Sequence, residues 1–97
     1  MVKHIILWKL KEEHNNDMVK QGIQDNLEAL LGKIPGLVEI KVQTTGLASS
    51  SADLMLYSVF ESEKALKEYS THPDHVYVAN TFVRPFTENR MCLDFEF

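Results

Sequence analysis

Four segments of the chain alternate with a period of two residues, which is the pattern of β-strands. They are residues 2–10, 37–45, 53–61 and 90–97. The first segment would place His4, Ile6, Trp8 and Leu10 on one face and Ile5 and Leu7 on the other. Because both faces of this strand are apolar, both need cover in the folded protein. In the second segment, Val38, Ile40 and Val42 would share one face.

Two other stretches have the three- and four-residue spacing of amphipathic helices. The first runs over residues 16–34 and is stopped by the Pro-Gly pair at residues 35–36. The second opens at Ser62, breaks at residues 70–72 and restarts at Pro73, a favoured first helical position. The residues of its first half that would point inward are Ala65, Leu66 and Tyr69.

The resulting order, β-α-β-β-α-β, predicts an α+β fold of the ferredoxin-like type. Its four-stranded antiparallel sheet carries both crossover helices on one face. The other face is then bare, although it holds apolar side chains: Ile5, Leu7, Met55, Tyr57 and Val59. A patch of that kind is unusual on a monomer. The sheet of a second copy is the simplest cover, so we expect a homodimer that pairs through this face.

Length, charge and cysteine content narrow the class of protein. The 97 residues, 44% hydrophobic and 25% charged, suit one domain spanning residues 1–97. The net charge is −4 and the cations are scattered along the chain, so we expect neither nucleic acid nor a membrane as a partner. Cys92 is the single cysteine, and neither a signal peptide nor a long apolar run is present, which favours a cytoplasmic location.

Two motifs resemble a known family. The opening Val-Lys-His-Ile-Ile-Leu-Trp-Lys-Leu-Lys of residues 2–11 resembles the start of the stress-responsive A/B barrel (Dabb) domain. The later Tyr-Ser-Thr-His-Pro-Asp-His of residues 69–75, with Cys-Leu-Asp-Phe at residues 92–95, resembles the second signature of the same family. The resemblance covers essentially the whole chain. It implies a dimeric α+β barrel built from two ferredoxin-like protomers, in agreement with the patterning.

The resemblance also implies a set of site residues. Most members of the family have no assigned reaction, but one plant member closes a polyketide chain by a cofactor-independent aldol condensation. The catalytic tyrosine and histidine of that enzyme match Tyr69 and His75 here, and an accessory pocket histidine matches His4. A further histidine of the enzyme falls at about Leu54, so polyketide cyclisation itself is not carried over.

The chemistry of these residues points to the same region. His4 lies in mid-strand beside Ile6 and Trp8, so its ring would lie between sheet and helices, as a core histidine or as part of a pocket wall. His75 and Tyr69 could form an acid–base pair in an apolar cavity. A histidine can remove a proton alpha to a carbonyl, and a tyrosine can donate to the developing enolate oxygen.

The other candidates have both a functional and a structural interpretation. Trp8, Phe60, His72 and Phe82 would complete the pocket wall, although inward aromatic residues often belong simply to the core. His72 and Asp74 can instead cap the helix that follows. A metal site begun by His72, Asp74 and His75 lacks further ligands at a recognised spacing, so neither a metal nor another cofactor is expected.

Three functions fit these observations. The first is a homodimer that binds a small apolar or aromatic carbonyl compound, with cyclase- or lyase-like acid–base chemistry that needs no cofactor. The second is a non-enzymatic, stress-associated structural dimer whose interior is filled by side chains. Fold analogy alone adds a third, a small cofactor-independent monooxygenase.

Overall fold

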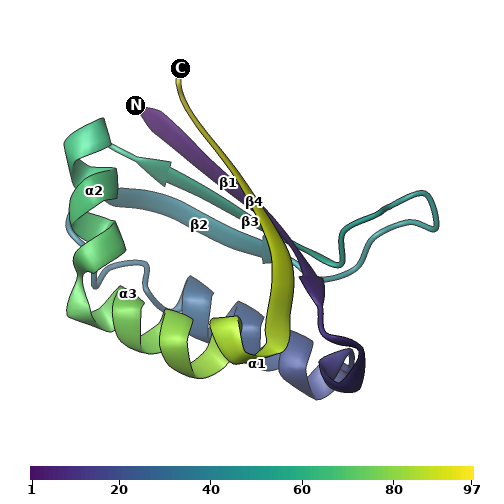
Figure 1. The fold of residues 1–97 in the computed structure, drawn as a ribbon. Helices are drawn as coiled ribbons and strands as arrows, with labels where there is room; N and C mark the ends of the chain where they lie inside the picture. The colour runs from purple at the N-terminus through teal and green to yellow at the C-terminus, as the bar shows by residue number, and fades with distance from the viewer.

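The computed structural model describes all 97 residues and contains one four-stranded antiparallel sheet, as the sequence predicts. The strands are β1 (Val2–Leu10), β2 (Leu37–Gln43), β3 (Leu54–Phe60) and β4 (Thr87–Glu96), in the spatial order β2-β3-β1-β4. The two termini therefore lie side by side on the two neighbouring strands β1 and β4 (Figure 1).

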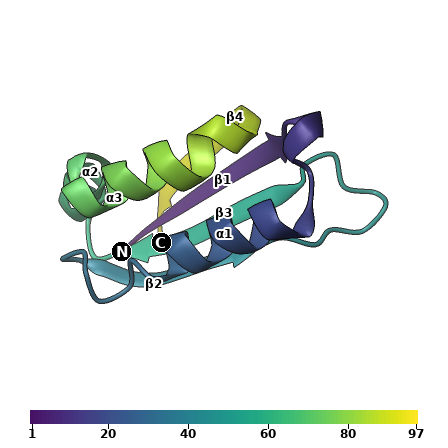
Figure 2. The ribbon, with the colours of Figure 1, turned by 90° about the horizontal axis from the view of Figure 1, so that it is seen from below.

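All helices lie on one side of the sheet (Figures 1 and 2). They are α1 (Asp17–Glu28), α2 (Glu63–Thr71) and α3 (Pro73–Val78). A π-helical stretch, Ala79–Val83, and a 3-10 turn, Arg84–Phe86, extend α3 toward β4, and a second 3-10 turn, Glu12–His14, precedes α1. The side chains of Asn16 and Ser62 cap α1 and α2 by accepting backbone N–H bonds from Val19 and Ala65. None of these helices has both the length and the apolar character needed to cross a membrane.

The first helix is shorter than the periodicity predicts. It ends at Glu28, and residues 29–35 form turns in which Gly32 takes a φ of 88°. Leu30 and Ile34 nevertheless remain buried in the core. Their spacing reflects burial against the sheet, and burial in this segment is achieved without a continuous helix.

A bulge in β2 changes the face on which one valine lies. Leu37 pairs with Phe60 and Glu39 with Val59, so Val38 is an extra residue in β2. Leu37, Ile40 and Val42 are therefore the buried residues, and Val38 is exposed. The prediction that Val38 shares a face with Ile40 and Val42 is wrong for this reason.

A second bulge lies in β4. Leu7 pairs with Met91 and Lys9 with Glu88, so Asn89 and Arg90 both lie opposite Trp8. Asn89 has a φ of 53°, a left-handed conformation that asparagine tolerates better than most residues. After the bulge, His4 pairs with Asp94 and Ile5 with Leu93. Even-numbered residues of β4 then face the helices, and odd-numbered residues face the bare side of the sheet.

The bare side of the sheet is apolar, as predicted. Met91 and Leu93 of β4 and the following Phe97 are strongly exposed, at 72%, 65% and 60%. Leu7 and Phe95 are also exposed, and Ile5, Met55 and Tyr57 are half-buried, whereas Val59 is already covered within the protomer. We refer to Ile5, Leu7, Met55, Tyr57, Met91, Leu93, Phe95 and Phe97 as the open face.

Candidate functional site

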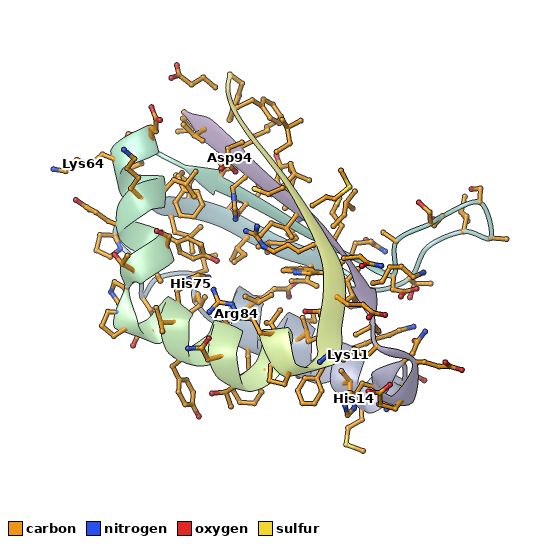
Figure 3. All side chains as sticks on the ribbon, in the orientation of Figure 1. Lys11, His14, Lys64, His75, Arg84 and Asp94 are labelled. Atoms are coloured by element: carbon orange, nitrogen blue, oxygen red, sulfur yellow. The ribbon has the colours of Figure 1, made fainter.

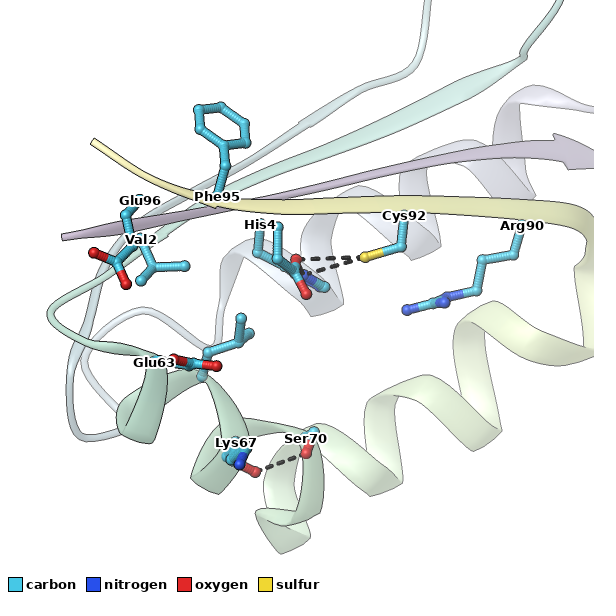
Figure 4. A pocket seen from close by; sticks show the side chains of 11 residues that line it. Val2, His4, Glu63, Lys67, Ser70, Arg90, Cys92, Phe95 and Glu96 are labelled. Carbon is cyan, nitrogen blue, oxygen red and sulfur yellow. Dashed lines mark hydrogen bonds and ion pairs between the residues drawn. The ribbon is translucent and has the colours of Figure 1, made fainter.

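Two adjoining cavities lie between the helices and strands β1 and β4. The inner cavity has a volume of about 150 Å³, and its wall includes Ile6, Trp8, Leu27, Leu56 and Val83. The outer cavity has a volume of about 550 Å³ and lies between α2 and β4 (Figure 4). The residues that line both cavities are His4, Leu66, Ser70 and Arg90. Binding pockets for small molecules commonly have volumes of roughly 300–1,000 Å³, so the outer cavity is large enough to hold a ligand that also enters the inner one.

His4 lies at the junction of the two cavities. It occupies the middle of β1 on the helix-facing side, is 6% exposed, and pairs across the sheet with Asp94. Its Nδ1 forms a hydrogen bond with the Asp94 carboxylate. An ionised carboxylate only accepts hydrogen bonds, so Nδ1 carries the proton and Nε2 remains for a ligand.

Tyr69 and His75 form the opposite wall of the inner cavity. Tyr69 comes from the last turn of α2, and His75 comes from the first turn of α3. Their rings stack with centroids 4.0 Å apart and an interplanar angle of 34°. Both the Tyr69 hydroxyl and His75 Nδ1 are buried and have no hydrogen-bond partner. Buried polar atoms of this kind are rare in folded proteins, and each calls for an explanation.

The buried surroundings fix the protonation states of these two side chains. Burial raises the pKa of Tyr69 well above its ordinary value, although the positive charge of Arg90 acts in the opposite direction. Burial lowers the pKa of His75 below 6.5, and the positive charges of Arg84 and Arg90 add to this effect, while the Ser70 backbone carbonyl opposes it. At neutral pH, Tyr69 is therefore a phenol that can donate, and His75 is a neutral imidazole that can accept a proton.

The inner cavity brings together four of the seven predicted site residues: His4, Trp8, Tyr69 and His75. The other three lie outside both cavity walls. Phe60 is fully buried behind Tyr69, with ring centroids 4.8 Å apart. Phe82 packs against Tyr77 on the helix layer. His72 caps α3, since its Nδ1 accepts the backbone N–H of Asp74 at 3.1 Å. His72 therefore has the structural role that the sequence allows as the alternative to a place in the pocket wall.

Six charged residues of the cavities were not singled out from the sequence: Glu63, Lys67, Arg84, Arg90, Asp94 and Glu96. Figure 3 shows His75 and Arg84 on the helix side of the space that Asp94 borders from the strand side. Asp94 could have been found from the predicted fold, because the ferredoxin-like topology pairs the first strand with the last. Finding it also requires the register of that pairing, which depends on the bulge at residues 89–90.

One cluster of side chains has the composition of a metal site. His4 Nδ1, Cys92 Sγ and an Asp94 carboxylate oxygen lie within 4.8 Å of one another. Burial raises the pKa of the Cys92 thiol, and the neighbouring Asp94 carboxylate raises it further, which disfavours the thiolate that a metal needs. The Cys92 thiol instead lies 3.4 Å from the Asp94 carboxylate, as a weak donor to it. No comparable cluster forms around His72 and Asp74.

Comparison with known proteins places this geometry in a family. The model of the stress responsive A/B barrel domain (Dabb) matches residues 2–97. A stress-response A/B barrel domain-containing protein of Arabidopsis thaliana is 30% identical over 96 residues, which are 97% of this chain. The chain spans 36% of the length of that relative.

Two solved structures illustrate the range of similar folds. A dimeric protein of unknown function with a ferredoxin-like fold from Bacteroides fragilis is 33% identical, with a TM-score of 0.88 over 99% of this chain and 95% of its own. A hydroxynitrile lyase from Passiflora edulis is 19% identical, with a TM-score of 0.82 over 97% of this chain and 90% of its own. The second likeness extends to the fold alone.

Proposed function

Because the chain belongs to the stress responsive A/B barrel domain family, we propose that it is a homodimer whose protomers each bind a small carbonyl compound and transfer protons within the bound molecule. The observation that carries the proposal is the pair of buried, unpartnered polar atoms in the inner cavity, the Tyr69 hydroxyl and His75 Nδ1.

The two unpartnered atoms are suited to a ligand that supplies their missing hydrogen bonds. A buried polar group without a partner destabilises the folded state by about 1–3 kcal/mol. A ligand carbonyl oxygen would accept from the Tyr69 hydroxyl. The apolar wall formed by Trp8, Leu27 and Leu56 suits the hydrocarbon part of the same ligand.

The protonation states suit proton abstraction alpha to that carbonyl. Neutral His75 would take the proton, and the electrons of the broken C–H bond would form the C=C bond of an enolate. Negative charge would then build on the carbonyl oxygen, where the Tyr69 phenol donates a hydrogen bond. His4, oriented by Asp94, offers Nε2 as a second proton-transfer group on the other wall.

The open face supports the proposal of a homodimer. Its exposed apolar row on β4 lies beside Leu7 and Ile5 of β1, so it forms one continuous patch. Patches of this kind are usually covered in the functional protein. The Bacteroides fragilis protein of similar fold is dimeric, and a second sheet packed on the open face is the arrangement we propose here.

Exchange of α-protons with solvent deuterium tests the proton-transfer step. Phenyl ketones such as acetophenone and 1-phenyl-2-propanone would be incubated with the protein in D₂O and followed by NMR. We expect exchange above the buffer rate, and we expect Tyr69→Phe and His75→Gln to lose it. Tyr77→Phe and His14→Gln are matched controls outside both cavities and should exchange like the unmodified protein.

Two results would contradict the proposal. Equal exchange in buffer and with protein would remove the acid–base chemistry, and unchanged exchange in both site variants would remove these residues from it. A dimer that binds none of the ketones would support the non-enzymatic structural function instead.

A further inference from the structure

We infer that the natural ligand is a small oxo acid whose carboxylate binds between Arg84 and Arg90 at the inner cavity. This inference rests on the proposed function, since it names the chemical class of the ligand for the same site. It is carried by the charge of the cavity, the direction of Arg90 and the lack of acidic partners for both arginines.

The charge of the inner cavity has one sign. Of its 13 lining residues, the only charged ones other than histidine are Arg84 and Arg90, and none is acidic. These are also the only two arginines of the chain, whose eight other cations are lysines. The planar guanidinium group of arginine matches a carboxylate with two parallel hydrogen bonds, which lysine cannot do.

The direction of Arg90 depends on the bulge in β4. Asn89 is the extra residue of this strand, so Arg90 lies on the helix-facing side with Cys92 and Asp94. Figure 4 shows its side chain reaching from β4 toward the helices. If the strand continued from the Lys9–Glu88 pair without a bulge, Arg90 would pair with Leu7 and point to the open face. Bulges commonly re-aim side chains next to active sites.

Neither arginine is neutralised by a carboxylate of the protein. The ion pairs of the structure are His4–Asp94 and Lys64–Glu68, and neither includes an arginine. Arg84 is held by a neutral group instead, since its guanidinium donates to the Asn80 side chain at 2.5 Å. Glu63, Asp94 and Glu96 border the outer cavity, but none of them forms an ion pair with Arg90, and Asp94 accepts a hydrogen bond from His4. An anionic ligand would therefore supply the missing negative charge.

The two arginines lie near the proposed proton-transfer residues, so they would place a bound carboxylate beside them. Arg84 and Arg90 both lie close enough to lower the pKa of His75. A carboxylate held between them places an adjacent ketone, and the carbon next to it, near His75 and the Tyr69 hydroxyl. The cavity would thus select oxo acids with an apolar substituent over neutral ketones of the same size.

Binding of a charged and a neutral version of one compound tests the inference. Benzoylformate is an aromatic oxo acid, and its methyl ester has the same skeleton without the charge. Neither has an exchangeable α-proton, so binding is measured without turnover. Trp8 is the only tryptophan and lines the inner cavity, so its fluorescence reports binding there, with calorimetry as a second measurement.

We expect the acid to bind about tenfold or more tightly than the ester, as suits one charge-assisted contact. Arg84→Gln and Arg90→Gln should each reduce this preference by weakening the binding of the acid, and the double variant should abolish it. Lys33→Gln removes a cation remote from both cavities and should keep the full preference. The preference should also shrink as the salt concentration rises.

Three outcomes would overturn the inference: equal affinity for acid and ester, a preference that survives in the double arginine variant, or no binding of benzoylformate at millimolar concentration. The exchange experiment with neutral ketones is separate. Exchange without a carboxylate preference would contradict the oxo-acid inference alone. A carboxylate preference without any exchange would contradict the proton-transfer proposal and leave the anion site in place.

Discussion

The hydroxyl of Tyr69 has opposite effects on stability and on the proposed activity. It is buried and makes no hydrogen bond, so it destabilises the protomer when no ligand is bound. We predict that Tyr69→Phe raises the free energy of unfolding by about 1 kcal/mol while the exchange activity is lost. Urea denaturation monitored by circular dichroism measures the first effect. Tyr77→Phe, at an exposed position on α3, should leave both quantities unchanged, and a marked destabilisation by Tyr69→Phe would contradict this account.

His75 should make the stability of the protein depend on pH in a defined direction. Its pKa is lowered in the folded state, so below pH 6.5 the unfolded chain binds more protons at this residue than the folded one. The contribution of His75 to stability is then present above pH 6.5 and is lost as the pH falls below it. The groups that face its ring are His4 on β1, Tyr69 on α2, Arg84 and Arg90.

The variant His75→Gln isolates this contribution. We predict that its free energy of unfolding changes less between pH 7 and pH 5 than that of the unmodified protein, measured by urea denaturation at each pH. His14→Gln removes a half-buried histidine of the first 3-10 turn and serves as the control. Identical pH profiles for His75→Gln and the unmodified protein would show that burial does not lower the pKa of His75.

At the scale of elements, the join between the first helix and β2 depends on a close approach to α2. Gly36 has a φ of 82°, and a Cβ atom there would lie 2.6 Å from the Cβ of Ala65. Gly32 has a similar φ of 88°, with nothing within 4 Å of an added Cβ. We predict that Gly32→Ala lowers the free energy of unfolding by about 1–2 kcal/mol, because alanine disfavours the left-handed backbone conformation. Gly36→Ala should lower it by about 1–3 kcal/mol more, because the added Cβ atom would also clash with Ala65.

Thermal or urea unfolding of the two glycine variants checks this difference. Since the backbone conformations are alike, the difference between the variants measures the contact with α2. Equal losses of stability would mean that α2 moves aside at little cost.

How well each helix or strand could be predicted depends on whether its burial leaves a regular pattern of apolar residues in the sequence. Alternation identified β1 and β3 within one residue, because both are flanked by strands and buried on the helix side. The periodicity predicted too long a first helix, because Leu30 and Ile34 keep the helical spacing although they lie in the turns that follow α1. Neither bulge is visible as a pattern, and this explains both the misplaced Val38 and the unrecognised Asp94.

The same limit applies to the site. His4, Tyr69 and His75 were found from their chemistry and from the resemblance of their motifs, and the structure brings them to one cavity. Arg84 and Arg90 look like ordinary surface cations in the sequence. Their position depends on the end of the helix layer and on the register of β4, which are properties of the folded chain.

At the scale of the whole molecule, the open face should determine the oligomeric state. Leu93 lies in the middle of its exposed row and pairs across the sheet with Ile5. We predict that Leu93→Glu converts a dimer to a monomer, because a charge at this position would be buried in the interface. Sedimentation velocity at micromolar concentration measures the change. Leu31→Glu, at an exposed leucine on the helix side, is the matched control and should remain dimeric. A monomeric unmodified protein would contradict the dimer.

The extra residue in β4 determines what each side of that strand can become during evolution. Alternate residues of one ribbon serve two purposes, with Arg90, Cys92 and Asp94 bordering the ligand site and Met91, Leu93 and Phe95 forming the open face. Point substitutions can therefore change ligand preference without touching the subunit contact, or the reverse. A strand of the same sequence that continued from the Lys9–Glu88 pair without the bulge would exchange the two sets at once, turning the charged row outward and the apolar row inward. The composition of each row can therefore vary independently, but both rows depend on the same bulge.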